Sequence, residues 1–280
     1  MKLYESTKYI YIAFLLLLYF HYFDENKYLK LKVCICTIGK KENKYALEFV
    51  EYYKKFGVDK IFIYDNNDVD GEKFDDVLRD YIKNGFVTVI NVRGKLKMQY
   101  PSANDCYKMN KDKYNWFLIY DMDEFIHLNN YKNIKKYLGN KNFSKCNVIY
   151  LNQILHTDNE HIYYSNNKII LRGNLTNINI YDPHRLANDY ECISTGSKFN
   201  GSNKEIYNNY YYYDHFYFKS SEEYLEKLTR GDAVFGVVRG FNHYWLDFYF
   251  DINKITKEKL DFFENKTGLN FSKYRDKCVK

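Results

Sequence analysis

Three carboxylates occur within four residues, Asp121, Asp123 and Glu124, in the stretch FLIYDMDEFIHL (117–128). Apolar residues precede and follow them, and carboxylates in such a setting are costly unless a cation or hydrogen-bond donors compensate their charge. Mn²⁺ and Mg²⁺ prefer oxygen ligands and also accept substrate phosphates. The spacing therefore predicts that Asp121 and Asp123 bind a divalent cation that holds a diphosphate; a solvated turn is the alternative. Glu124 either anchors the turn or contacts an acceptor.

The carboxylates follow the fourth of a series of expected strands that alternate with helices. The expected strands are 33–38, 60–67, 86–92 and 116–121, and the expected helices are 43–56, 74–83 and 102–111. Gly57 follows the first helix in the position of a C-terminal stop signal. Strands that alternate with helices predict parallel pairing in an α/β sheet, where ligands bind at the carboxyl ends of the strands.

Other polar residues end the expected strands in the same way as Asp121. Thr37 ends the first strand, and Asp65 and Asn66 end the second. A shared edge of the sheet would bring these side chains together. Asp65 and Asn66 are also residues that stabilise turns, so ordinary turn chemistry is the alternative.

The second half of the chain alternates less regularly, and no linker divides it into separate domains. Strand-like runs occur at 148–155, 168–173 and 177–182. A helix is expected at 221–230, because Ser220 and Glu223 form a capping-box pattern before it and Gly231 follows it. Lys227 and Arg230 would share one face of this helix.

Composition excludes several classes of function. The chain has 280 residues, of which 46% are apolar, and a net charge of +6. The charge is spread over mixed runs, which argues against a dedicated nucleic-acid binder but allows an anionic small substrate. The six cysteines lack the spacing of a zinc site. Cys34 and Cys36, two apart in one strand-like run, are expected to be buried free thiols, with disulfides as the alternative.

The N-terminus predicts a membrane segment. Residues 9–23 carry no charge and are flanked by Lys8 and Asp24. We expect a single-pass signal anchor at 9–23, between a tail (1–8) and a stem (24–32), with one globular domain at 33–280. A cleaved signal or a buried helix is the alternative. An excess of Asn-x-Ser/Thr sequons suggests a secretory compartment, although Golgi, bacterial and viral membranes all remain open.

Four segments of the chain, taken in order, resemble glycosyltransferase family 92. YDMDEF (120–125) is similar to the family's DxDEF motif, and residues 47–70 are similar to its E-W-I-E-Y-H, G-V and Y-D-N-x-S-x-D pattern, with Phe49 for Trp and Tyr53 for His. DPHRLA (182–187) resembles its mid-chain histidine segment, and residues 214–231 resemble H-Y-x-x-K-S-x-E-E-F-x-x-K-x-x-R-G.

The resemblance implies an inverting enzyme of the GT-A fold, with a mixed, mostly parallel sheet flanked by helices. It implies a UDP-sugar donor, with galactose as the expected hexose, a glycan or other hydroxyl acceptor, and Mn²⁺ or Mg²⁺. The roles that follow are metal ligands Asp121, Asp123 and His215, with His184 as the other candidate histidine, and donor contacts Thr37, Asp65, Asn66, Gln99, Asn104, Lys219, Lys227 and Arg230. For the catalytic base we favour Asp158, with Glu160, Asp182 and Asp189 as the other candidates.

Two other classes of function remain open from the sequence. Paired aspartates also serve metal-dependent nucleotidyltransferases and phosphohydrolases, which would release pyrophosphate or phosphate. A non-catalytic sugar-binding relative would keep the fold without turnover.

Overall fold

The computed structural model describes residues 28–156, 162–186, 188–202, 206–220 and 256–267, together with Ile12, Phe14, Leu15, Glu223, Tyr224, Lys227, Arg230 and Val234. Asp158 and all but three residues of the expected anchor lie outside this part. None of the helices within the described ranges is long and apolar enough to cross a membrane.

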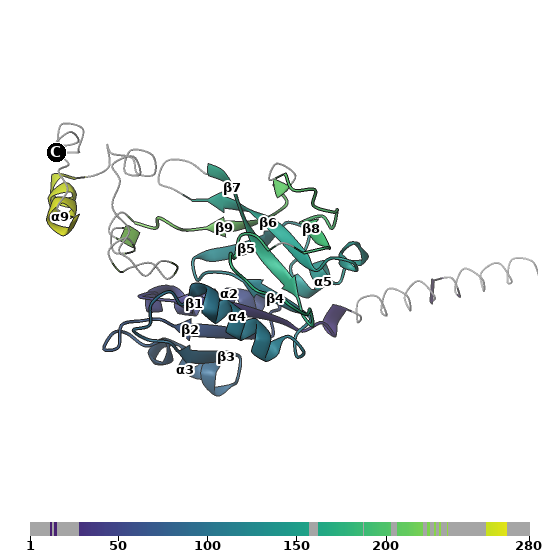
Figure 1. Ribbon diagram of the computed structural model, residues 1–280, viewed down its shortest axis with the longest axis horizontal. Helices are drawn as coiled ribbons and strands as arrows, with labels where there is room; N and C mark the ends of the chain where they lie inside the picture. The colour runs from purple at the N-terminus through teal and green to yellow at the C-terminus, as the bar shows by residue number, and fades with distance from the viewer. Residues whose placement is uncertain are drawn as a thin grey trace, which may run out of the picture.

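The secondary structure follows the expected alternation up to residue 119 (Figure 1). The elements are β1 (Val33–Gly39), α2 (Asn43–Lys55), β2 (Lys60–Asp65), α3 (Phe74–Lys83), β3 (Val87–Asn91), α4 (Gln99–Asn110), β4 (Trp116–Ile119), β5 (Glu124–Leu128), α5 (Ile134–Leu138), η1 (Lys141–Phe143), β6 (Val148–Leu155), β7 (Ile162–Arg172), β8 (Glu191–Ile193), β9 (Tyr211–His215) and α9 (Lys257–Thr267).

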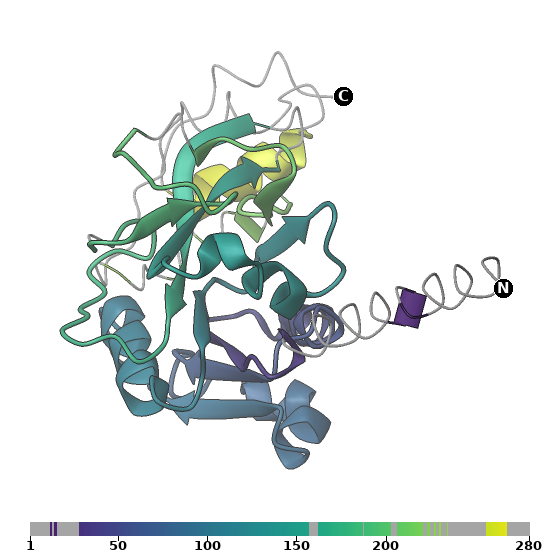
Figure 2. The same cartoon turned by 90° about the vertical axis from the view of Figure 1, so that its right-hand side faces the viewer.

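The described strands form one nine-stranded sheet in the order β3-β2-β1-β4-β7-β6-β9-β5, with β8 paired to the start of β6. The pairs β2–β3, β1–β2, β1–β4, β6–β8 and β6–β9 are parallel, whereas β4–β7, β6–β7 and β5–β9 are antiparallel. The expected mixed, mostly parallel sheet is confirmed. Figure 2 shows the first four strands at the base of the molecule and the later strands above them.

Alternating side chains of β1 build a separate core on each face of the sheet. Val33 and Ile35 pack with the buried residues of α2 and α3, whereas Cys34 and Cys36 face the side covered by α4. Gly57 has a φ of +93° directly after the last turn of α2, which confirms the expected stop signal.

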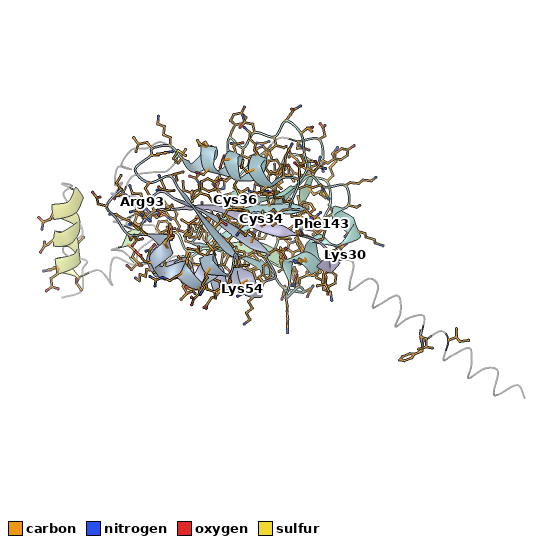
Figure 3. The ribbon with its side chains drawn as sticks, turned by 90° about the horizontal axis from the view of Figure 1, so that it is seen from below. Lys30, Cys34, Cys36, Lys54, Arg93 and Phe143 are labelled. Carbon is orange, nitrogen blue, oxygen red and sulfur yellow. A yellow bond between two sulfur atoms is a disulfide. The ribbon has the colours of Figure 1, made fainter. Side chains whose placement is uncertain are left out.

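Two sequence-based expectations about this part of the chain are wrong. Residues 177–182 form no strand, because their backbone runs through bends and loop at the surface of the sheet. The expectation of a free thiol fails for Cys36, which forms a disulfide with Cys106; Cys34 is free and buried, as expected. A second disulfide joins Cys146 to Cys192. Figure 3 shows Cys34 and Cys36 in the interior of the molecule.

Candidate active site

The three carboxylates lie on a tight turn between β4 and β5. The amide of Glu124 donates to the carbonyl of Asp121 (3.1 Å), and the Oε2 atom of Glu124 accepts from the amide of Asp121 (2.9 Å). Met122 is fully buried. It packs so closely against Gly39, the last residue of β1, that a side chain at position 39 would meet it. The turn is therefore closed by two hydrogen bonds and fixed to the core by its middle residue. Glu124 anchors the turn.

Lys168 on β7 neutralises two of the carboxylates. Its Nζ atom lies 2.8 Å from Oδ2 of Asp121 and 3.0 Å from Oε2 of Glu124. Burial would raise the pKa of Asp121, but the Lys168 ammonium outweighs it and lowers the pKa below its usual value. Burial raises the pKa of Glu124 to about 7, although Lys168 opposes this shift. The ion pairs keep Asp121 charged inside the protein.

Asp123 has different partners from Asp121. Its Oδ2 atom accepts from Nζ of Lys227 (2.6 Å), and its Oδ1 atom lies 3.5 Å from Nε2 of His215. Burial opposes ionisation of Asp123, but Lys227 and then His215 hold its pKa well below the usual range. The two aspartates therefore lie on one turn but in two separate charge environments.

The ring of His215 is oriented by Gln153. Its Nδ1 atom lies 2.9 Å from Oε1 of Gln153, and the hydroxyl of Tyr213 donates to the same oxygen (3.1 Å). An amide oxygen only accepts, so Nδ1 donates to Gln153, and this contact orients the ring with Nε2 toward Asp123. Metal-binding histidines commonly donate their other nitrogen to such an acceptor.

The donor set around Asp123 fits a hard divalent cation. Asp123 Oδ1 and His215 Nε2 supply one oxygen and one nitrogen at a separation that one ion can span. Asp121 is held by Lys168, and the described residues contain no group of three His, Cys, Asp or Glu side chains placed to share a metal. A cation here would need oxygens of the substrate to complete its coordination.

His184 lies in another part of the site. Its Nδ1 atom donates to the carbonyl of Asn167 (2.7 Å), the residue before Lys168. Burial lowers the pKa of His184, and Lys168 lowers it further. The ring of His184 contacts this carbonyl, whereas the ring of His215 lies beside Asp123. The geometry therefore favours His215 over His184 as the partner of Asp123.

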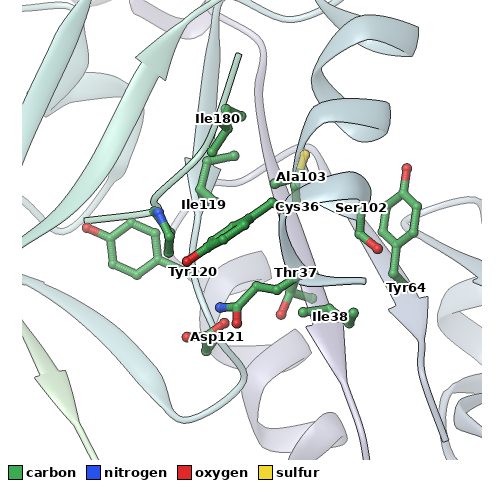
Figure 4. A pocket seen from close by; sticks show the side chains of 13 residues that line it. Cys36, Thr37, Ile38, Tyr64, Ser102, Ala103, Ile119, Tyr120, Asp121 and Ile180 are labelled. Carbon is green, nitrogen blue, oxygen red and sulfur yellow. The ribbon is translucent and has the colours of Figure 1, made fainter. Parts of the chain in front are cut away.

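A narrow pocket opens at the carboxyl ends of β1 and β4 (Figure 4). We call it the hydroxyl pocket; it is defined by Thr37, Tyr64, Gln99, Tyr100, Ser102 and Asp121. The Oγ1 atom of Thr37 and the Oγ atom of Ser102 are buried and have no hydrogen-bond partner among the described residues. Buried polar atoms are normally paired, so these two hydroxyl groups indicate a ligand or water that binds here.

Asp65, Asn66 and Asn104 were predicted to contact the donor, but they stabilise the fold and do not line this pocket. Asp65 accepts from Arg93 and Asn67 (3.0 Å each), and the side chain of Asn66 donates to the carbonyls of Val92 and Lys95. The guanidinium of Arg93 also donates to the carbonyls of Asp68, Val69, Gly71 and Glu72, and so fixes the loop after β2.

Asn104 links α4 to the loop that follows β7. Its side-chain amide donates to the carbonyl of Ile180 (2.8 Å), and its oxygen accepts from the amide of the same residue (2.8 Å). Ile180 lines the hydroxyl pocket, so Asn104 supports the wall of the pocket from outside.

A second pocket lies beyond Asp123. We call it the charged pocket; its volume is about 350 Å³, and it is defined by Glu42, Lys44, Lys219, Glu223, Lys227 and Arg230. Arg230 pairs with Glu42 (3.0 Å) and Lys44 with Glu223 (2.7 Å). The ammonium of Lys219 lies 3.8 Å from the ring centroid of Tyr45. The expected cationic group of Lys219, Lys227 and Arg230 therefore lines one pocket.

The capping box that was expected before 221–230 is present. The amide of Glu223 donates to Oγ of Ser220, and the amide of Ser220 donates to Oε2 of Glu223 (3.2 Å each). Glu223, Tyr224 and Lys227 are helical. Gly231 and Asp158 lie outside the described residues.

Sequence reasoning missed Lys168, Ser102 and Arg93. Lys168 begins the strand-like run KIILR. A lysine in such an apolar run indicates a carboxylate partner, because a lysine is almost never buried unless its charge is paired. Ser102 and Arg93 carried no comparable signal, because their roles depend on elements that are distant in sequence.

Comparison with known proteins gives one family. The model of the family "Glycosyltransferase family 92" matches residues 30–186, which is more than half of the chain. The match includes the turn with Asp121 and Asp123 and extends through most of DPHRLA, whereas the segment 214–231 lies beyond it.

Two plant proteins show the same relationship. A glycosyltransferase family 92 protein of Ricinus communis is 30% identical over 126 residues, covering 45% of this chain and 22% of that protein. One from Oryza sativa subsp. japonica is 26% identical over 108 residues, covering 39% and 18%. The chain thus matches about a fifth of the length of these relatives.

Among solved structures, residues 1–349 of S. aureus TarS are similar, with a TM-score of 0.44 and 11% identity, covering 70% of this chain and 64% of that one. The same fragment in complex with UDP gives a TM-score of 0.38 and 13% identity over 48% and 39%.

Proposed function

The chain belongs to glycosyltransferase family 92, and on this basis we propose that it transfers a hexose from a UDP-sugar to a hydroxyl of a glycan or other acceptor. We expect galactose as the hexose and inversion at the transferred carbon. In this proposal the fold is of the GT-A type, and residues 33–280 form the catalytic domain.

The observation that carries the proposal is the position of Asp123 between His215 and Lys227, at the carboxyl edge of the parallel strands and next to the hydroxyl pocket. Carboxylate, imidazole and ammonium groups at one point suit a diphosphate that binds together with a cation. Asp121 lines the hydroxyl pocket, and Lys227, which pairs with Asp123, lines the charged pocket. A donor that lies along this turn would contact both.

We assign the nucleoside to the hydroxyl pocket. The hydroxyl groups of Thr37 and Ser102 would gain the hydrogen bonds they lack in the protein alone. The pocket has a volume of about 20 Å³, so it must widen to admit a nucleoside. The hexose and the acceptor would then lie toward the charged pocket.

Asp123 and His215 would hold Mn²⁺ or Mg²⁺, which when bound would offset negative charge on the leaving diphosphate. Lys227 and Arg230 would add positive charge on the side of the charged pocket, with Lys219 nearby. Asp158 remains our proposal for the base that takes the proton of the acceptor hydroxyl. Residues 9–23 are proposed to anchor the protein in a membrane as a single-pass segment.

A donor screen tests this function. The purified full-length chain would be incubated with UDP- and GDP-sugars in Mn²⁺, in Mg²⁺ and in EDTA, and nucleotide release and donor-induced thermal shifts would be measured. We expect release of UDP in the presence of metal. Release of pyrophosphate or phosphate instead would indicate a nucleotidyltransferase or phosphohydrolase. Donor binding without release would indicate a non-catalytic relative. The absence of both binding and release with every donor tested would contradict the proposal.

A further inference from the structure

We propose that Lys168 is a positioning residue for donor binding: it fixes the carboxylate of Asp121 at the wall of the hydroxyl pocket. The inference rests on the proposed function, since the donor is a uridine nucleotide. Lys168 lies on β7, a strand that carries none of the residues assigned above to the donor or the metal.

The geometry around Lys168 is that of a built-in counter-ion. The side chain is completely buried, and its ammonium contacts Asp121 at 2.8 Å and Glu124 at 3.0 Å. A lysine is almost never fully buried unless its charge is paired. The two contacts therefore account for its presence in the interior of the sheet.

Lys168 acts on the pocket through Asp121. Glu124 is fully buried, whereas the side chain of Asp121 is 32% exposed and lines the hydroxyl pocket. One oxygen of Asp121 is held by Lys168, and its backbone amide is held by Glu124. Lys168, Asp121 and Glu124 thus form a closed set in which only Asp121 reaches the pocket.

Without Lys168 this set would come apart. Asp121 and Glu124 would lose their shared cation, and the more exposed of the two, Asp121, would turn toward solvent. Removing the partner that orients a metal-binding side chain typically costs on the order of 10- to 100-fold in metal affinity or activity, and we expect a loss of the same order in donor affinity here. Lys168 is thus expected to act on donor affinity in addition to stability.

Three variants separate positioning from folding. Lys168→Met removes the cation, and the double variant Lys168→Met/Glu124→Gln also removes the second buried charge, which should restore much of the lost thermal stability. Lys135→Met is the matched control, because Lys135 is also a largely buried lysine in an ion pair, with Asp59 (2.5 Å), at the opposite end of β1.

The measurement is the Kd for UDP by calorimetry, at a temperature at which every variant is folded. We expect binding about 10- to 100-fold weaker in both Lys168 variants and unchanged binding in Lys135→Met. Wild-type affinity for UDP in the double variant would overturn this inference but would leave the proposed function standing. A lack of UDP binding by the unaltered chain would overturn the proposed function as well.

Discussion

The two pockets beside the Asp121–Asp123 turn are held together by different forces. The hydroxyl pocket has a volume of about 20 Å³ and is bordered by Cys36, whose disulfide to Cys106 joins β1 to α4. The charged pocket has a volume of about 350 Å³, and ion pairs such as Arg230–Glu42 join its walls. One pocket is narrow and covalently fixed, and the other is open and held by charges.

This difference suggests a division of tasks along the turn. A narrow pocket with unpaired hydroxyl groups can select the shape and hydrogen bonds of a base or ribose. A larger pocket lined by lysines suits a phosphate or a sugar that must leave after reaction. Asp121 and Asp123, which have separate counter-ions, connect the two.

The largest expected effect comes from the group between the pockets. Asp123→Asn should lower transfer on the order of 10²- to 10³-fold, because the neutral side chain no longer supports a cation or Lys227. Steady-state UDP release with a saturating donor measures this effect. Asp76→Asn, at an exposed position of α3, is the control and should be unaffected. Full activity of Asp123→Asn would show that transfer does not need the Asp123 carboxylate between the two pockets.

The disulfide distinguishes the hydroxyl pocket from the charged one. Cys106→Ser should lower the free energy of unfolding by about 2–4 kcal/mol and also weaken UDP binding, since α4 is no longer tied to β1. Cys192→Ser breaks the other disulfide, which lies away from the pocket.

Denaturant unfolding and UDP calorimetry on both cysteine variants give the answer. We expect a similar loss of stability in the two, but weaker UDP binding only in Cys106→Ser. Equal UDP affinity in the two variants would argue against a covalently fixed pocket.

Removing either unpaired hydroxyl group should have a smaller effect, which differs in direction between stability and UDP binding. Thr37→Val should leave the stability unchanged or raise it, because a buried hydroxyl without a partner is removed. UDP binding should weaken by about 0.5–1.5 kcal/mol, roughly two- to tenfold in Kd. Ser102→Ala should behave in the same way. Lower stability together with unchanged UDP affinity would assign these hydroxyl groups to the architecture alone.

The smallest effect is expected at the edge of the charged pocket and depends on pH. Burial would raise the pKa of Glu223, but hydrogen bonds from Lys44, Tyr45 and the amide of Ser220 lower it to about 2. Since this is below the unfolded value of about 4.3, Glu223 stabilises the fold above pH 4.3, and the contribution is lost as pH falls toward 2.

Glu223→Gln keeps the capping box and removes the charge. It should be less stable than the unaltered chain at pH 5, by under about 1 kcal/mol, and the difference should shrink at pH 3. Urea unfolding at both values measures it. A constant difference would mean that the charge of Glu223 does not hold this helix to α2.

The sequence predicted the first half of the fold well. Periodicity and stop signals located β1 to β4 and α2 to α4 within a few residues, and the carboxyl-edge argument brought Thr37 and Asp121 to one pocket. It failed where a residue's role depends on a distant partner. Asp65 and Asn66 end a strand as predicted, yet Arg93 and the carbonyls of Val92 and Lys95 occupy their polar atoms.

What the sequence by itself determined is which residues carry charge and where each strand ends, because side-chain type and local periodicity are properties of neighbouring residues. Only the tertiary structure decided which cation each carboxylate receives. Lys168, 47 residues after Asp121, reaches it from strand β7, and Lys227, 104 residues after Asp123, reaches that carboxylate from a helical position. Asp121 and Asp123 of one turn thus differ because the fold brings Lys168 to the first and Lys227 to the second.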